Sequence, residues 1–129
     1  MRSTSTQRFR RSANGRSQIL WNAARQRALK SGIPFTITRE WLDPKVAAGR
    51  CEYTNLHLDL EPIKGLTKNP FAPSLDRIDN SLGYTPENTR LVAAVLNYAK
   101  NEWNDTVLAM FCIAFLRKWS NEQSYTGTS

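Results

Sequence analysis

Residues 74–103 read SLDRIDNSLGYTPENTRLVAAVLNYAKNEW, and this stretch decides the fold. From Leu75 to Asp79 apolar and polar side chains alternate, which is typical of a half-buried strand. Residues 80–88 are rich in turn formers, and residues 89–93 form a second β-prone run. A helix is expected next, from about residue 94 to residue 103. The stretch therefore predicts two strands joined by a loop and followed by a helix.

Two side chains of this stretch have the chemistry of metal ligands. Asp76 lies on the first predicted strand, and Asn97 lies on the predicted helix. Hydrolysis of a phosphodiester bond needs a cation that stabilises the leaving oxygen and the charged transition state. Mg²⁺ prefers oxygen ligands, and one carboxylate with one amide oxygen leaves positions for phosphate and water. If the helix packs across the two strands, Asp76 and Asn97 supply such a pair.

The same stretch resembles the motif of HNH (ββα-metal) endonucleases. The resemblance spans roughly residues 17–110 and is densest between residues 69 and 103. It is strongest for the small phage and bacterial members that carry a Ser-Leu-Asp-Arg-Ile-Asp motif, which residues 74–79 spell here. The other matching residues are Gly83, Tyr84, Asn88, Leu91, Val92, Asn97 and Lys100.

The resemblance implies a role for four residues. Asp76 stands where the family has its metal-binding aspartate, and Asn97 stands where a helix-borne His or Asn completes the metal site. Asn88 matches the middle Asn of the family name, which holds the loop between the strands by hydrogen bonds. Lys100 stands at a basic position near phosphate. The implied cofactor is a divalent ion, Mg²⁺ or Mn²⁺.

Arg77 departs from the family pattern because it stands where the family has the histidine that acts as general base. An arginine stays protonated near neutral pH and does not accept a proton from water. Three explanations are open. Asp79 or His57, the only histidine, serves as the base; a metal-bound water ionises while Arg77 fixes the phosphate; or the site binds DNA without cutting it.

The charge of the chain points to a polyanionic partner. Eighteen Lys and Arg against eleven Asp and Glu give a net charge of +7. The excess is concentrated at the N-terminal end, before the first acidic residue, and arginine grips phosphates with two hydrogen bonds. The residues expected to contact DNA, together with Lys100, are Arg8, Arg10, Arg11, Arg16, Arg25, Arg27 and Lys30.

The rest of the chain reads as the flanks of one domain. Residues 1–14 are expected to form a flexible basic arm, and residues 15–129 a single nuclease domain with the ββα-metal unit at about 74–103. Helices are predicted over about 17–31, 39–48 and 105–122, the last with Asp105 as N-cap and a wide apolar face in the core. Residues 35–38 are expected to be a strand, 51–60 a strand or hairpin, and 61–73 a loop.

These features predict an α+β fold in which N- and C-terminal helices flank a ββα-metal unit. The predicted function is that of a metal-dependent endonuclease, a hydrolase that acts on double-stranded DNA as a monomer or homodimer. Two alternatives are a non-catalytic DNA-binding protein on a degenerate HNH scaffold and a basic RNA-binding protein. No structural zinc is expected, because Cys51 and Cys112 form no ligand set. No membrane helix or secretory signal is expected, so we predict a cytoplasmic protein of a bacterium or a phage-infected cell.

Overall fold

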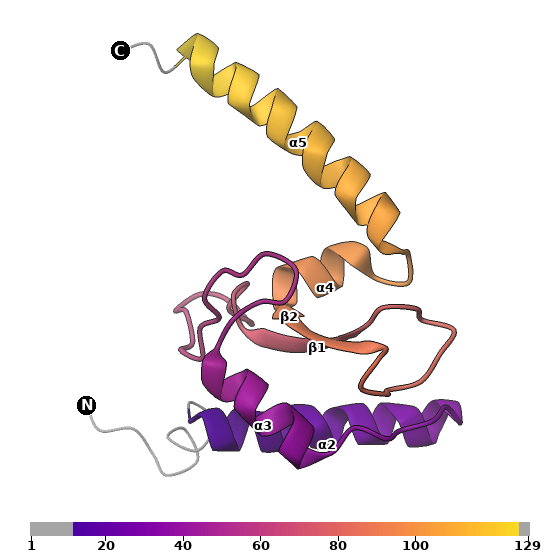
Figure 1. The fold of residues 1–129 in the computed structure, drawn as a ribbon. Coiled ribbons are helices and arrows are strands. Elements are labelled where there is room, and N and C mark those ends of the chain that lie inside the picture. Colours follow the sequence, from indigo (N-terminus) through magenta and orange to yellow (C-terminus); the bar gives the residue numbers. More distant parts are fainter. Residues whose placement is uncertain (1–11, 127–129) are drawn as a thin grey trace, which may run out of the picture.

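A computed structural model of the chain describes residues 12–126, with side chains up to residue 123. Its elements follow one another as α2 (Ala13–Ser31), α3 (Arg39–Ala48), β1 (Pro73–Arg77), β2 (Thr89–Ala93), α4 (Ala94–Lys100) and α5 (Asp105–Thr126). The two strands lie in the middle of the body, with α2 and α3 on one side and α4 on the other (Figure 1). The α+β prediction is confirmed.

The strands β1 and β2 form an antiparallel pair that fixes the position of the polar motif. Leu75 pairs with Leu91, and Asp76 pairs with Arg90. Because neighbouring residues of a strand point to opposite faces, Leu75 faces the main core while Asp76 faces α4. The chain then enters α4 directly from β2, so the helix lies across the face of the hairpin that carries Asp76.

The core lies between the hairpin and the two N-terminal helices. It is formed by residues of α2, of α3 and of the connection between them, and by residues of the hairpin and its loop. These are Ala24, Ala28, Ile37, Leu42, Val46, Leu75, Tyr84 and Leu91. Both helices have the predicted end signals. Thr38 Oγ1 accepts a hydrogen bond from Trp41 N at the start of α3, and Gly32 and Gly49 end α2 and α3 with φ of +66°.

Several segments differ from the prediction. Helix α2 begins at Ala13, so its first turn includes the last two residues of the predicted arm. Residues 35–38 form no strand, because Phe35 makes only an isolated bridge with Tyr84. Residues 51–60 form turns with one bridge from Arg50 to His57, and not a hairpin ladder. These runs are β-prone, but neither has a neighbouring strand with which to continue a ladder.

Helix α4 ends at Lys100, three residues earlier than predicted, and Asn104 rather than Asp105 caps α5 by accepting a hydrogen bond from Val107 N.

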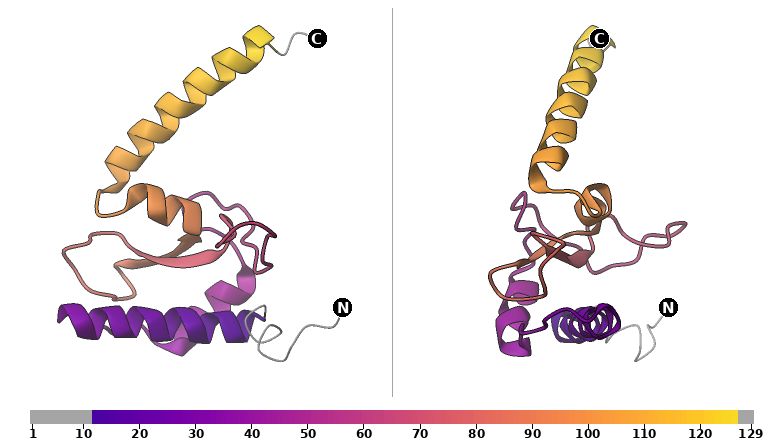
Figure 2. Two further views of the ribbon diagram at one scale, coloured as in Figure 1. Left: turned by 180° about the vertical axis from the view of Figure 1, so that it is seen from behind. Right: turned by 90° about the vertical axis from the view of Figure 1, so that its right-hand side faces the viewer.

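The prediction that the apolar face of α5 belongs to the core is wrong. After its first turns α5 projects away from the body, and Figure 2 shows this from two further directions. Over the residues that the structure describes, no helix is long and apolar enough to cross a membrane.

The loop between the strands is held against the α2–α3 connection at Gly83. A Cβ at residue 83 would lie 2.3 Å from Pro34 O and 2.9 Å from Pro34 Cβ. We predict that Gly83→Ala lowers the free energy of unfolding by about 1–3 kcal/mol, the usual cost of overpacking. Gly65→Ala is the control for an added methyl group, because nothing lies within 4 Å of that position and only its φ of +87° opposes the change. Urea unfolding followed by circular dichroism measures both. Equal losses in the two variants would contradict the close packing at Gly83.

Candidate functional site

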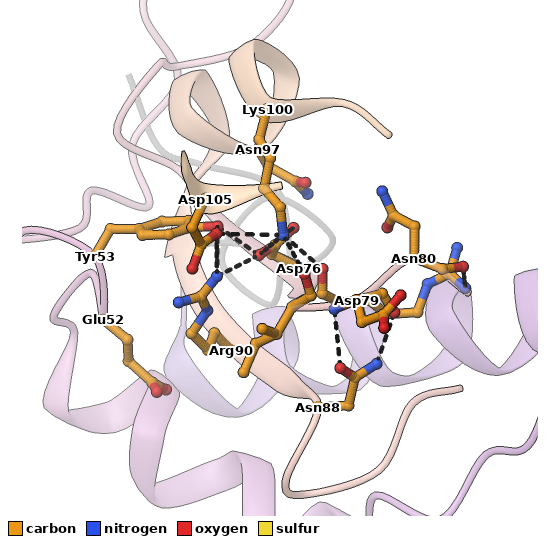
Figure 3. Close-up of polar contacts among 12 residues, drawn as sticks. Glu52, Tyr53, Asp76, Asp79, Asn80, Asn88, Arg90, Asn97, Lys100 and Asp105 are labelled. Carbon is orange, nitrogen blue, oxygen red and sulfur yellow. Dashed lines mark hydrogen bonds and ion pairs between the residues drawn. The ribbon is translucent and has the colours of Figure 1, made fainter. Parts of the chain in front are cut away.

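Asp76 is a buried carboxylate at the centre of a polar cluster between the hairpin and α4. Its exposed fraction is 2%. Lys100 Nζ lies 3.2 Å from Asp76 Oδ1 and 3.0 Å from Oδ2, and Arg90 Nη2 lies 3.2 Å from Oδ2. Tyr53 Oη donates to the same Oδ2 at 2.8 Å. These side chains converge from the loop before β1, from both strands and from α4 (Figure 3).

Lys100 has a different place from the one that the resemblance implied. Its side chain is buried, and Nζ also donates to the backbone oxygens of Arg77 at 2.7 Å and Ile78 at 3.1 Å. A buried ammonium has three N–H groups, and each one left without an acceptor would cost desolvation energy. The four oxygens around Lys100 Nζ satisfy all three. Lys100 therefore ties α4 to the end of β1 in this arrangement, and it does not face solvent where a phosphate would lie.

Asp105 extends the cluster to the first turn of α5. Arg90 Nη2 lies 2.8 Å from Asp105 Oδ1, and Tyr53 Oη lies 2.9 Å from the same oxygen. The hydrogen bond from Arg90 holds the pKa of the Asp105 carboxyl below its ordinary value. Burial, reinforced by hydrogen bonds to Asp76 and Asp105, raises the pKa of Tyr53 far above the usual phenol range, so Tyr53 stays protonated. With two carboxylates and two cations, the formal charges of the cluster cancel.

A cleft of about 650 Å³ opens beside this cluster. Asp76 and Asn97 line it together, so the structure brings the two predicted metal ligands to one cavity. Arg77 lines the same cleft. The remaining walls come from α2, from the loop before β1, from β1 itself, from the loop between the strands and from α4 with the residues after it. They are Arg27, Lys68, Ser74, Leu75, Asn80, Tyr84, Tyr98, Asn101 and Glu102.

The oxygen donors of this cleft fit a hard divalent ion. Asn97 Nδ2 donates to Ser74 Oγ at 2.7 Å and to Leu75 O at 3.2 Å, which fixes the amide, and no described residue donates to its Oδ1. A carboxylate and an amide oxygen are ligands of the type that Mg²⁺ selects. The described residues contain no group of three or more His, Cys, Asp or Glu that would form a complete protein ligand set. Lys100 already neutralises Asp76, so an ion bound there has to compete with its ammonium.

Arg27 and Arg77 both stack on the ring of Tyr84 at the cleft wall. The guanidinium carbons of Arg27 and Arg77 lie 5.8 Å and 5.2 Å from the centre of the Tyr84 ring, and Arg27 Nε donates to Tyr84 Oη at 3.0 Å. Arg77 Nη1 donates to the backbone oxygens of Asn80 and Leu82. Within residues 12–123 neither arginine has a carboxylate partner. This pair of cations is therefore available to an anion in the cleft.

The other predicted catalytic residues lie in or around the loop between the strands. Asn88 is buried and holds this loop: its Oδ1 accepts from Asp79 N, and its Nδ2 donates to the oxygens of Asp79 and Gly83. Asp79 faces a second depression and not the cleft of Asp76. Hydrogen bonds from Ser81 hold the pKa of Asp79 below its ordinary value, which makes it a weaker base. His57 is exposed and does not line the cleft.

Glu102 is a cleft carboxylate that the sequence analysis did not single out. It is exposed, and it makes no ion pair with any described residue. The chain reaches it through Asn101, whose φ of +50° ends α4 and redirects the backbone. No local sequence signal identifies Glu102 as a cleft residue, because its position depends on how the chain turns after α4.

The predicted DNA-binding residues are spread over α2 and beyond. Arg25 and Lys30 are exposed on α2, and Arg25 stacks 5.8 Å from the Trp21 ring. Arg16 is half-buried near the start of the same helix. Only Arg27 among the predicted α2 cations lines the cleft. The predicted contacts Arg8, Arg10 and Arg11 lie outside the described residues.

We predict that Lys100→Met destabilises the protein by about 3–5 kcal/mol, because it leaves the buried charge of Asp76 without its closest cation. Lys64→Met is the matched control, since Lys64 is exposed and forms no ion pair with a described residue; its effect should stay within about 0.5 kcal/mol. Both values follow from urea unfolding at one protein concentration. A Lys100→Met protein as stable as the control would show that this pair does not hold α4 on the hairpin.

Comparison with known proteins gives one informative result. No family model and no curated protein matches the sequence. Among solved structures, the chain is similar to the rare-cutting HNH restriction endonuclease PacI, whose structure was described for its mechanism of DNA perturbation. The TM-score is 0.56 at 18% sequence identity, over 94% of this chain and 92% of PacI. The chain thus has the fold of an HNH endonuclease, a ββα core with flanking helices.

Proposed function

We propose that this protein is a metal-dependent DNA endonuclease that hydrolyses a phosphodiester bond in the cleft beside Asp76. The observation that carries the proposal is the composition of the cleft, in which Asp76 and Asn97 share one cavity with Arg27 and Arg77. Oxygen ligands for a divalent ion and unpaired guanidinium groups for phosphate are the two requirements of this reaction. The similarity of the fold to an HNH restriction endonuclease supports the same reaction class.

In this proposal Asp76 and Asn97 hold the ion, Mg²⁺ or Mn²⁺. When bound, such an ion stabilises the charge that develops on the phosphate and the leaving oxygen. Ser74 and Lys100 position the two ligands: Ser74 Oγ accepts from Asn97 Nδ2, and Lys100 fixes the Asp76 carboxylate. Arg27 and Arg77 hold phosphate oxygens through the guanidinium nitrogens that the protein leaves free. The basic face of α2 adds contacts to the backbone of the duplex.

Glu102 is the residue that we assign as proton acceptor for the attacking water. Arg77 remains charged and cannot accept a proton from water. Asp79 opens to the neighbouring depression, and His57 lies away from the cleft. Glu102 lines the cleft as well as the second depression, and it makes no ion pair with any described residue that would hold it away from a water molecule.

A DNA-binding protein without nuclease activity is the second candidate, and the charge balance at Asp76 is the observation that favours it. Both oxygens of this carboxylate are already in contact with Lys100. If no divalent ion displaces part of this interaction, the cleft still binds phosphate but does not hydrolyse it. Metal binding therefore separates the two functions before any activity is measured.

We predict that the protein nicks supercoiled plasmid in Mg²⁺ or Mn²⁺, and that Asn97→Ala and Glu102→Gln each lower the rate by about 10²-fold or more, as expected for loss of a metal ligand or a general base. Glu87→Gln is the matched control, because Glu87 is an exposed glutamate of the interstrand loop that does not line the cleft. The rate of conversion to open circles measures all three.

A second readout of the same experiment is independent of activity. Thermal unfolding in Mn²⁺ and in EDTA should show a metal-dependent rise of Tm in the parent protein and in Glu102→Gln, but a smaller one in Asn97→Ala. A Tm that does not respond to metal, together with intact plasmid, would favour the non-catalytic candidate. Full nicking by Glu102→Gln would contradict only the assignment of the proton acceptor.

We also predict that Arg27→Gln weakens duplex binding and reduces the slope of log K against log salt by about 0.9, the value for one lost phosphate contact. Arg117→Gln is the control, because this exposed arginine lies on α5 and does not line the cleft. Fluorescence anisotropy with a short labelled duplex at several salt concentrations measures both. An unchanged slope in Arg27→Gln would remove this residue from the phosphate contacts.

A further inference from the structure

Asp76 and Asp105 share the same three neighbours at the centre of the polar cluster. Tyr53 Oη lies 2.8 Å from Asp76 Oδ2 and 2.9 Å from Asp105 Oδ1. Arg90 Nη2 lies 3.2 Å from the first of these oxygens and 2.8 Å from the second. Lys100 Nζ lies 3.0 Å from Asp76 Oδ2 and 3.6 Å from Asp105 Oδ1 (Figure 3). Each of these three side chains therefore has a second carboxylate within reach.

The two carboxylates differ in their surroundings. Asp76 is buried and lines the cleft together with Asn97. The side chain of Asp105 is 43% exposed, and it does not line the cleft. Asp76 is therefore placed to meet an ion in the cleft, whereas Asp105 contacts the cations of the cluster and not the cleft.

Lys100 can exchange one carboxylate for the other without losing a hydrogen bond. Its ammonium has three N–H groups. The backbone oxygens of Arg77 and Ile78 accept two of them, at 2.7 Å and 3.1 Å, and these two bonds do not involve either carboxylate. The third N–H is left for Asp76 or for Asp105. Shortening the distance from Lys100 Nζ to Asp105 Oδ1 by about 0.5 Å is enough to form that hydrogen bond.

The charge balance of the cluster also calls for a second carboxylate. In the metal-free cluster the charges of Asp76 and Asp105 cancel those of Arg90 and Lys100. A divalent ion at Asp76 brings two further positive charges, and without Asp105 it would share a single carboxylate with both side-chain cations. A buried ion that loses its partner is strongly destabilising. Because Arg90 and Lys100 already lie beside Asp105, both keep a carboxylate when the oxygens of Asp76 are occupied.

We propose that Asp105 is a positioning residue that takes over Lys100 and Arg90 when a divalent ion binds to Asp76 and Asn97. The inference rests on the metal site of the proposed function and adds a residue to it that does not touch the ion. It explains how a carboxylate that is fully paired within the metal-free protein can still serve as a ligand. The ammonium of Lys100 moves from one carboxylate to the other while its two backbone hydrogen bonds stay in place.

Titration of the DNA-free protein with Mn²⁺, followed by the electron paramagnetic resonance signal of the free ion, tests the role of Asp105. Asp105→Asn should bind Mn²⁺ about tenfold or more weakly than the parent protein, because Lys100 and Arg90 then have only Asp76 as a carboxylate partner. Asp43→Asn is the matched control: Asp43 is 45% exposed and pairs with Arg39 at 2.8 Å, much as Asp105 pairs with Arg90. It should bind Mn²⁺ as the parent does. Asp105→Glu keeps the carboxylate and should stay close to the parent affinity.

The Tm in EDTA separates this role from a merely structural one. In the metal-free protein Asp76 still pairs with both cations, so Asp105→Asn should unfold in EDTA at nearly the same temperature as Asp43→Asn. Only the affinity for Mn²⁺ should distinguish the two variants. Glu102→Gln removes a negative charge from the cleft without removing a partner of Lys100, so it reports the effect of charge alone. An equal loss of affinity in Glu102→Gln and Asp105→Asn would overturn the inference.

A crystal structure of the parent protein with Mn²⁺ tests the exchange directly and needs no variant. Lys100 Nζ should lie within about 3.2 Å of a carboxylate oxygen of Asp105 and should have left at least one oxygen of Asp76. An ammonium that still contacts both oxygens of Asp76 beside the bound ion would overturn the inference. Equal Mn²⁺ affinity in Asp105→Asn and the parent would do the same and would leave the metal site standing. A parent protein that binds no Mn²⁺ would overturn this inference together with the metal site of the proposed function.

Discussion

Asp76 lies with 2% of its surface exposed between the hairpin and α4, and a carboxylate in such a place must be paired or it destabilises the fold. Lys100 and Arg90 provide that pairing from two different elements. The backbone acceptors on Arg77 and Ile78 complete the shell of Lys100, so the end of β1 and the end of α4 become one unit. This unit forms one wall of the cleft.

The pairing of Asp76 with Lys100 and Arg90 bears directly on metal binding in the cleft. A carboxylate that binds a divalent ion usually has few positively charged side chains around it, whereas Asp76 forms ion pairs with both Arg90 and Lys100. Buried ion pairs contribute little net stability compared with apolar packing, but removal of one partner is costly. The protein therefore pairs the Asp76 carboxylate at the cleft wall with its own side chains. A metal ion that binds Asp76 and Asn97 has to compete with the Lys100 ammonium for the oxygens of Asp76.

Local signals in the sequence were sufficient for much of the fold. The β-prone run from Thr89 to Ala93 predicted β2, and the alternation of Leu75 to Asp79 predicted β1, because a hairpin with one face on the core imposes a period of two. Strand β1 lies two residues earlier than this alternation, at Pro73–Arg77. Thr38 and Gly49 predicted the ends of α3 because capping depends on neighbouring backbone groups alone. The pairing of Asp76 with Asn97 in one cleft followed from the expected helix across the hairpin.

Features that depend on distant contacts were not predictable in this way. Nothing local to Tyr53 or Arg90 indicates that both reach Asp76, since Tyr53 lies 23 residues away in the sequence. The burial of Lys100 follows from the same cluster. The apolar face of α5 was predicted to lie in the core, and this was wrong, because amphipathic periodicity identifies an apolar face but does not say what packs against it. Among residues 12–123 nothing packs on this face beyond its first turns.

Arg90 has one further consequence, because its guanidinium joins Asp76 in the cleft wall to Asp105 at the root of α5. The direction in which α5 leaves the body is thus fixed at the same point as the carboxylate. Loss of the Asp105 carboxylate would therefore free the first turn of α5 and, in the same step, leave Arg90 and Tyr53 with Asp76 as their remaining carboxylate partner.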